Sequence, residues 1–324
     1  MKRGVRGKHG FGVALGQRMG AAALTMSLFF SVAALVAPSA GASTDFTAFA
    51  APLSGATDYA TNFPSPFGFG PAGILRDNTS FFAYDVGNGQ LYKFPAAGGS
   101  ATTATSVAEP FNYGIGLAAG VYYGTSADSA RTFNPTTLAA GPLLNFDVSC
   151  QTVSVIADPV SSSAIFMSSF CGIYRIVNPL SASPTVTRIS PTQAFFDGLT
   201  ITSDGQHLWG ADYFAGNVVE LSRTGTVQNT IFIGVDNPDG LAVARPNTTI
   251  GSINVSNNVF VNDNDGTVKR IDTNNGNAVS TVASGGTRGD HATVGPDGCY
   301  YVTQSDRVEK LAPCFFQTTV PPSN

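Results

Sequence analysis

The chain has 324 residues, of which 43% are hydrophobic and only 12% are charged. Its formal net charge of −4 at pH 7 argues against a nucleic-acid partner, because such a partner requires a basic face that displaces counterions from phosphates. Few charges together with 36 glycines are typical of many short strands joined by tight turns, with few helices.

Residues 1–42 have the composition of an export signal. Five basic residues and no acidic one precede an apolar run at residues 19–37, and Ala40-Gly41-Ala42 then gives an A-x-A cleavage pattern. The apolar run is also long enough to span a bilayer, which leaves an uncleaved anchor as the alternative. Cleavage would leave 12 basic and 21 acidic residues, a formal net charge of −9. We therefore expect one mature domain at residues 43–324, secreted or periplasmic in a bacterium, monomeric and not inserted in a membrane.

A unit of about 43 residues then recurs six times along the chain. Each unit combines an opening strand, a polar hairpin turn and a strand that closes on an apolar residue. The closing residues are Phe94, Phe133, Ile176, Leu221, Ile271 and Leu311. Six such units predict an all-β fold, a six-bladed β-propeller with four-stranded antiparallel blades.

The opening strands differ in clarity along the chain. The first two units begin with the degenerate "GPAGIL" (residues 70–75) and "NYGIGL" (residues 112–117), whereas later units begin with "FDGL" (residues 196–199) and "PDGL" (residues 238–241). The fifth unit carries an insertion at residues 245–258, expected as an exposed loop. Ring closure stays open: residues 43–52 could add a strand to the last blade, or residues 315–320 could complete it.

All four cysteines lie in the expected mature domain, as an oxidising compartment favours. Cys150 and Cys171 are placed symmetrically about one polar turn, and Cys299 and Cys314 about another. Cysteines symmetric about a hairpin turn face each other across its strands. The spacing therefore predicts the disulfides Cys150–Cys171 and Cys299–Cys314, both structural.

Three acidic residues mark a candidate site. Asp197, Asp239 and Asp290 stand at the start of the innermost strand in three consecutive units, where side chains tend to point at the central channel. Converging carboxylates repel one another, so one interpretation is a channel cation, Ca²⁺ or another divalent ion, held by all three. The other interpretation is that each aspartate caps its own turn.

His291 is the candidate catalytic residue. It stands where other units have glycine, and histidine is the side chain whose charge changes near neutral pH. Strand neighbours point to opposite faces, so we expect it to meet Asp197 or Asp239 across the channel and not Asp290. A structural role is the alternative. His207 falls at a turn and should be solvated, and the Arg-Gly-Asp triplet at residues 288–290 is interpreted as a chance match to adhesion motifs.

The opening and hairpin patterns resemble the NHL and SMP-30/gluconolactonase superfamily of six-bladed propellers, best over residues 195–311. The resemblance implies a divalent metal held by a Glu of the first blade, an Asn and an Asp. Asp239 matches that Asp, Asp197 stands at the Asn position, and the first unit has no Glu. Propellers host both enzymes and binding modules.

Two functional classes follow from the sequence. The first is a secreted binding or interaction module for a small molecule or an extracellular or cell-envelope ligand, with a cation in the channel. The second is a metal-dependent lactone hydrolase, with Asp197, Asp239 and Asp290 as ligands and His291 as base or substrate contact. A lyase that uses His291 and the metal is a third, weaker interpretation.

Overall fold

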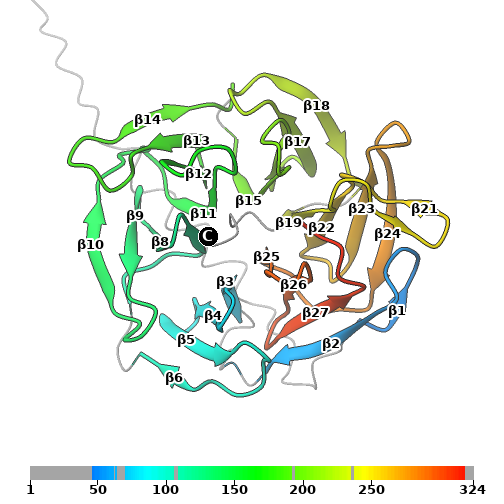
Figure 1. The fold of residues 1–324 in the computed structure, drawn as a ribbon, viewed down its shortest axis with the longest axis horizontal. Helices are drawn as coiled ribbons and strands as arrows, with labels where there is room; N and C mark the ends of the chain where they lie inside the picture. The colour runs from blue at the N-terminus through cyan, green and yellow to red at the C-terminus, as the bar shows by residue number, and fades with distance from the viewer. Residues whose placement is uncertain are drawn as a thin grey trace, which may run out of the picture. The chain divides into compact units, whose positions relative to one another are not determined.

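The computed structural model describes residues 46–61, 63, 70–105, 109–191, 194–234 and 237–317. The expected signal at residues 1–42 lies outside these ranges. Within them the chain forms strands and turns, and no helix long and apolar enough to cross a membrane occurs. Six antiparallel blades surround a central channel, which confirms the six-bladed β-propeller (Figure 1).

The first three blades are four-stranded and run in chain order from the channel outward. Their strands are β3 (Pro71–Arg76), β4 (Ser80–Asp85), β5 (Gln90–Pro95) and β6 (Thr103–Ala104); β7 (Ile115–Ala118), β8 (Val121–Ser126), β9 (Ser129–Phe133) and β10 (Ala140–Leu144); and β11 (Thr152–Ala157), β12 (Ala164–Ser169), β13 (Gly172–Val177) and β14 (Thr185–Arg188).

The last three blades repeat this order, and the fifth and sixth each gain a strand from the N-terminal side. Their strands are β15 (Phe196–Ile201), β16 (Leu208–Asp212), β17 (Asn217–Leu221) and β18 (Val227–Phe232); β19 (Pro238–Val243), β22 (Val259–Asp263), β23 (Val268–Asp272) and β24 (Ala278–Ser284); and β25 (Ala292–Val294), β26 (Tyr300–Thr303) and β27 (Val308–Ala312). All six closing residues of the repeat lie on the third strand of their blade.

Two N-terminal strands close the ring. The short β1 (Ala48–Phe49) pairs with β24 of the fifth blade, and β2 (Gly55–Ala60) pairs with β27 as the outer strand of the sixth. Closure therefore comes from the N-terminal side, although the strand of the sixth blade lies just beyond residues 43–52. At the other end, Phe316 forms only an isolated bridge with Ala244.

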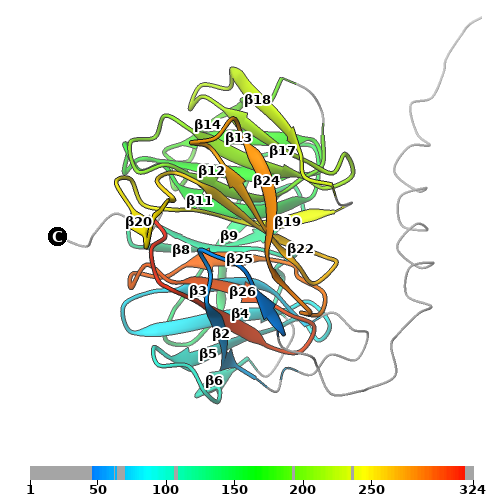
Figure 2. The same ribbon diagram turned by 90° about the vertical axis from the view of Figure 1, so that its right-hand side faces the viewer.

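The insertion in the fifth blade is more ordered than a plain exposed loop. It forms a small hairpin of β20 (Thr249–Ile250) and β21 (Ile253–Asn254), seen at the edge of the propeller in Figure 2. Val255, just after it, is fully buried against Phe316 and the other apolar residues between the fifth and sixth blades.

Hydrophobic clusters fill all six interfaces between adjacent blades. Neighbouring residues of one strand contribute to different interfaces, because strand side chains alternate between faces. On β12, Ile165 packs toward the second blade and Phe166 toward the fourth. On β4, Phe81 and Phe82 divide in the same way between the sixth and second blades. Each blade is thus apolar on both faces, and its position depends on both neighbours.

Glycine at the start of the inner strands lets these strands crowd round the channel. A Cβ added at Gly114 would overlap the carbonyl oxygen of Val153 in the next blade, and one at Gly198 would overlap the carbonyl oxygen of Asp239. The sixth blade has His291 at the corresponding position, so a large side chain enters the channel there.

Both expected disulfides are present, and the described residues contain no free cysteine. Cys150–Cys171 joins the open end of the β11–β12 hairpin, opposite its turn. Cys299–Cys314 joins the ends of the β26–β27 hairpin, on the blade that closes the ring. Two disulfides are typical of a protein that folds in an oxidising compartment.

We expect the double substitution Cys299→Ser/Cys314→Ser to lower the free energy of unfolding by about 3 kcal/mol, because it frees a loop of 15 residues in the unfolded chain. Chemical denaturation under oxidising conditions measures the change, with Cys150→Ser/Cys171→Ser as the matched pair. A loss below about 0.5 kcal/mol for both pairs would show that neither disulfide supports the ring.

Candidate functional site: a carboxylate and histidine cluster in the channel

A shift in register at the start of the inner strands positions the candidate residues. Phe196 and Pro238 pair with the last residue of the second strand of their blades, and the register then slips by one residue. Such a bulge re-aims the side chain that follows it. The corresponding positions carry, in blade order, Ala72, Tyr113, Val153, Asp197, Asp239 and Asp290. Three consecutive blades therefore bring carboxylates to one side of the channel.

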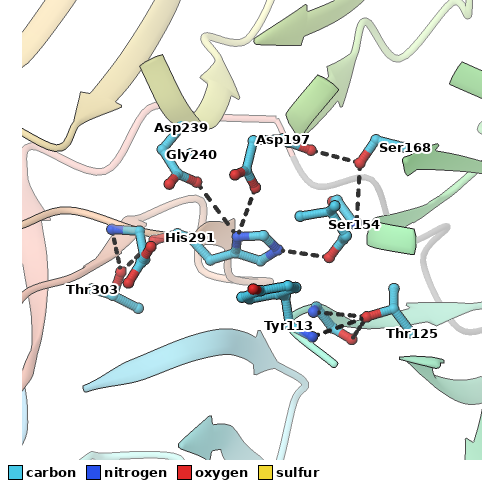
Figure 3. Close-up of polar contacts among 12 residues, drawn as sticks. Tyr113, Thr125, Ser154, Ser168, Asp197, Asp239, Gly240, His291 and Thr303 are labelled. Carbon is cyan, nitrogen blue, oxygen red and sulfur yellow. Dashed lines mark hydrogen bonds and ion pairs between the residues drawn. The ribbon is translucent and has the colours of Figure 1, made fainter. Parts of the chain in front are cut away.

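His291 reaches across the channel from the sixth blade (Figure 3). Its Nδ1 lies 3.5 Å from Asp197 Oδ1 and 3.5 Å from Asp239 Oδ1. Its Nε2 lies 3.1 Å from the carbonyl oxygen of Val153, on the opposite blade. The three side chains are buried, and their candidate ligand atoms all lie within 4.8 Å of one another. The contact with Asp197 and Asp239 is the one that strand geometry predicts.

The contact with Val153 assigns the proton on the imidazole. A carbonyl oxygen only accepts hydrogen bonds, so Nε2 carries a hydrogen and donates it. In a neutral imidazole Nδ1 then has a lone pair, which points toward two carboxylate oxygens. Asp197 Oδ1 and Asp239 Oδ1 have no hydrogen-bond partner. Three acceptor atoms therefore converge on one buried point, and a cation or an additional proton must lie among them.

The electrostatics of the carboxylates agree with this geometry. Burial, followed by the charge of Asp239, holds the pKa of Asp197 well above its ordinary value. Burial and the charge of Asp290 likewise raise the pKa of Asp239. Without a bound cation, the protein favours protonation of this pair.

Asp290 belongs to the cluster but has its own partner. Its Oδ1 lies 2.7 Å from a guanidinium nitrogen of Arg288, and its backbone N–H donates to Thr303 Oγ1. Burial raises the pKa of Asp290, and the charge of Arg288 opposes that rise. The Arg-Gly-Asp triplet thus places an ion pair beside the cluster, a role for Arg288 that its interpretation as a chance match did not include.

Two tyrosines near the cluster were missed by the sequence interpretation. Burial and the negative charge of Asp197 raise the pKa of Tyr113, whereas burial and the charge of Asp239 raise that of Tyr213. Tyr113 lies beside the imidazole in Figure 3. The alignment of "NYGI" with "FDGL" held the signal for Tyr113, because it places the tyrosine at the position in its unit that Asp197 has in the fourth. For Tyr213, which lies in a hairpin turn, the repeat offers no such signal.

The channel narrows beyond His291. A cavity of about 30 Å³, room for little more than a water molecule, is lined there by His291 and apolar residues such as Ile74, Ile115 and Leu241. A ligand larger than water would therefore have to reach the cluster from the end of the channel where the inner strands begin. His207 lies away from it, at a turn, and is less solvated than expected, since only 43% of its side chain is exposed and its Nδ1 lies 2.5 Å from the buried Glu220.

In cation-free protein at pH 8, we expect Asp239→Asn to raise the free energy of unfolding by roughly 2 kcal/mol, because it removes a buried charge. The raised pKa values favour the folded state below about pH 4, and this contribution is lost as pH rises through the folded-state pKa. Thermal unfolding from pH 5 to 8 with a chelator should therefore show a flatter profile for Asp239→Asn than for wild type. The exposed Asp147→Asn is the control, and equal profiles for all three proteins would contradict the argument.

No family model matches this chain, and no curated protein matches it. Solved structures of similar fold include regucalcin, a calcium-binding protein from Agrobacterium tumefaciens strain C58, at 14% identity and a TM-score of 0.58 over 83% of this chain and 97% of that one. A gluconolactonase from Xanthomonas campestris is 14% identical, with a TM-score of 0.59 over 85% and 94%. A streptogramin B lyase is 16% identical, with a TM-score of 0.52 over 75% and 78%. The chain is thus structurally similar to the six-bladed propellers of regucalcin, gluconolactonase and streptogramin B lyase.

Proposed function

We propose that Asp197, Asp239 and His291 bind one divalent cation, and that the protein is a cation-dependent hydrolase of lactones or other esters. The observation that carries the proposal is the convergence of three buried acceptor atoms, two of which lack a hydrogen-bond partner. A divalent cation satisfies all three at once. The structural similarity to a calcium-binding regucalcin and a gluconolactonase supports the same chemistry.

The donor set favours a narrower choice of cation than the sequence, which left Ca²⁺ or another divalent ion open. Three carboxylates would suit Ca²⁺, which prefers oxygen ligands. With an imidazole nitrogen in place of the carboxylate of Asp290, the set favours Zn²⁺ or Mn²⁺, which accept nitrogen readily. The hydrogen bond from Nε2 to Val153 would hold the ring in the tautomer that a metal ligand needs.

The same geometry exchanges two of the expected roles. With Nδ1 on the cation and Nε2 donating to Val153, neither nitrogen of His291 is free to accept a proton. Asp290 stands beside the cluster, oriented by Arg288, and is the better candidate for the general base. A bound cation would polarise the substrate carbonyl and acidify a water molecule. In the reaction the water oxygen bonds to the acyl carbon, the acyl C–O bond breaks, and the departing oxygen takes up a proton.

A binding module is the second candidate. In the first blade, Ala72 stands at the position that corresponds to Asp197, so that blade offers no ligand where the superfamily resemblance implies a Glu. A cation held by three protein ligands could serve to hold blades together or to bind a small ligand without turnover. For either function we place the protein in the periplasm or outside the cell, in keeping with its two disulfides, and we expect a monomer.

We expect chelator-treated protein to bind one equivalent of Mn²⁺ or Zn²⁺ in calorimetric titration, at least about tenfold more tightly than Ca²⁺. Asp239→Asn and His291→Ala should each weaken this binding by about 100-fold or more. His207→Ala, which changes the other described histidine, should bind as wild type does. Absence of heat with all three ions, and of any ion-dependent rise in Tm, would show that a proton rather than a metal holds the cluster together.

Hydrolysis of simple lactones by metal-loaded protein tests the enzyme assignment. We expect Asp290→Asn to lower kcat by about 10²–10⁴-fold, as loss of a general base predicts, and to change metal affinity far less than Asp239→Asn does. His291→Ala should lose metal and activity together. Metal binding without hydrolysis of any lactone or ester would favour the binding module.

A further inference from the structure

Aromatic side chains form a continuous wall beside the cluster. Phe170, in the β12–β13 hairpin, stacks on Phe195 with ring centroids 4.0 Å apart. Phe195 contacts Tyr213 at 5.1 Å and Phe214 at 4.9 Å, both in the β16–β17 hairpin. Tyr113 adjoins the other end, 6.5 Å from Phe170. We call Tyr113, Phe170, Phe195, Tyr213 and Phe214 the aromatic wall.

The wall lies at the end of the channel where the inner strands begin. Phe195 is two residues before Asp197 in the chain. The charges of Asp197 and Asp239 contribute to the raised pKa values of Tyr113 and Tyr213, so both tyrosines lie near these carboxylates. All five residues precede an inner strand or lie in a hairpin between second and third strands, which is the end where the cluster lies. A substrate that reaches the cluster therefore passes the aromatic wall.

The wall is more exposed than a packed core would leave it. Phe214 is 71% exposed, the largest value among the large hydrophobic residues of the described chain, and the other four are partly exposed. Backbone hydrogen bonds hold it in place, from Tyr213 N–H to the carbonyl of Phe195 and from Asn237 N–H to the carbonyl of Tyr213. A preformed apolar surface next to a few convergent polar groups is typical of small-molecule sites.

A shallow hollow is lined by residues that adjoin members of the wall in the chain or through a disulfide. It has a volume of about 510 Å³ and is lined by polar and small residues. Asn112 of its lining precedes Tyr113 in the chain, and Cys150 is bonded to Cys171, which follows Phe170. The hollow is large enough for a substituent that projects past the aromatic rings.

We propose that the substrates are esters or lactones bearing an aromatic or other flat apolar group, which stacks on Phe195 and its neighbours while the acyl group reaches the cluster. The inference rests on the proposed function. Stacking on aromatic faces contributes beyond the area that it buries, with preferred offset or edge-on geometries like those within the wall. A polyhydroxylated sugar lactone has polar groups round its edge and offers the wall a smaller apolar face than a fused aromatic ring does.

Three six-membered lactones test the proposal: dihydrocoumarin, δ-valerolactone and glucono-δ-lactone. They share the reacting ring and differ in a fused aromatic ring or hydroxyl groups. We expect Phe195→Ala and Phe214→Ala to raise KM for dihydrocoumarin by roughly 5–20-fold and to leave kcat/KM for δ-valerolactone within about twofold. Dihydrocoumarin releases a phenolate and the other two lactones release an alkoxide, so their rates differ for reasons unrelated to binding. The comparison is therefore between variant and wild type on each substrate.

Phe232→Ala is the matched control. Phe232 is a similarly exposed phenylalanine, 65% accessible, on the outer strand β18 of the same blade, and it makes none of the wall's ring contacts. It should change nothing for any of the three lactones. Equal losses on all three lactones in the wall variants, or a preference for glucono-δ-lactone that the variants do not alter, would overturn the proposal.

A binding measurement separates this proposal from the proposed function. The lactams 3,4-dihydro-2(1H)-quinolinone and δ-valerolactam have the corresponding rings but resist hydrolysis. Calorimetry should show binding of the aromatic lactam that falls about 5–20-fold in Phe195→Ala, even if no lactone is turned over. If no lactone is hydrolysed but Phe195→Ala still weakens binding of the aromatic lactam, only the enzyme assignment is refuted. Equal affinity of wild type and Phe195→Ala for the aromatic lactam would refute aromatic recognition.

Discussion

The crowding of six inner strands round one axis is the constraint on which the rest of the structure depends. At Gly114 and Gly198 the neighbouring blade leaves no room for a Cβ atom. Each blade is also apolar on both faces, so it is stable only between two neighbours, and the ring must close. The N-terminal strand β2 meets this requirement by completing the sixth blade, which ties the two ends of the domain together.

The channel cluster is a consequence of that crowding. Because the inner strands approach so closely, carboxylates from adjacent blades are brought together with few other polar groups around them. His291 stands in the sixth blade where other blades have glycine, and its side chain enters the channel. Its Nε2 is hydrogen-bonded to the carbonyl oxygen of Val153 in the third blade. The arrangement disfavours the cation-free folded state, since burial and mutual repulsion raise the pKa values of Asp197 and Asp239. Functional sites commonly carry such a cost, and a bound cation would offset it.

The aromatic wall adds the second half of a ligand site. The polar cluster is positioned by strands, whereas the wall comes from hairpin turns and the segments between blades. Loops on a rigid scaffold commonly provide specificity, because they vary without disturbing the core. The division suits the proposed function, in which Asp197, Asp239, His291 and Asp290 would carry the chemistry and the aromatic wall would set substrate choice.

The sequence by itself determined the architecture and the location of the site. The repeat of about 43 residues specified six blades, and the x-D-G pattern within it marked Asp197 and Asp239. The symmetry of the cysteines about two turns specified both disulfides. All these patterns are local in the chain, and in a propeller each repeat has a fixed place in the ring. Tertiary structure decided what lies across the channel: that His291 spans from the sixth blade to the third, that Arg288 pairs with Asp290, and that Tyr213 joins Phe170 and Phe195. Two of these contacts, His291 with Val153 and Phe170 with Phe195, join residues from different blades, and the distance between such residues depends on how the ring closes, which no single repeat encodes.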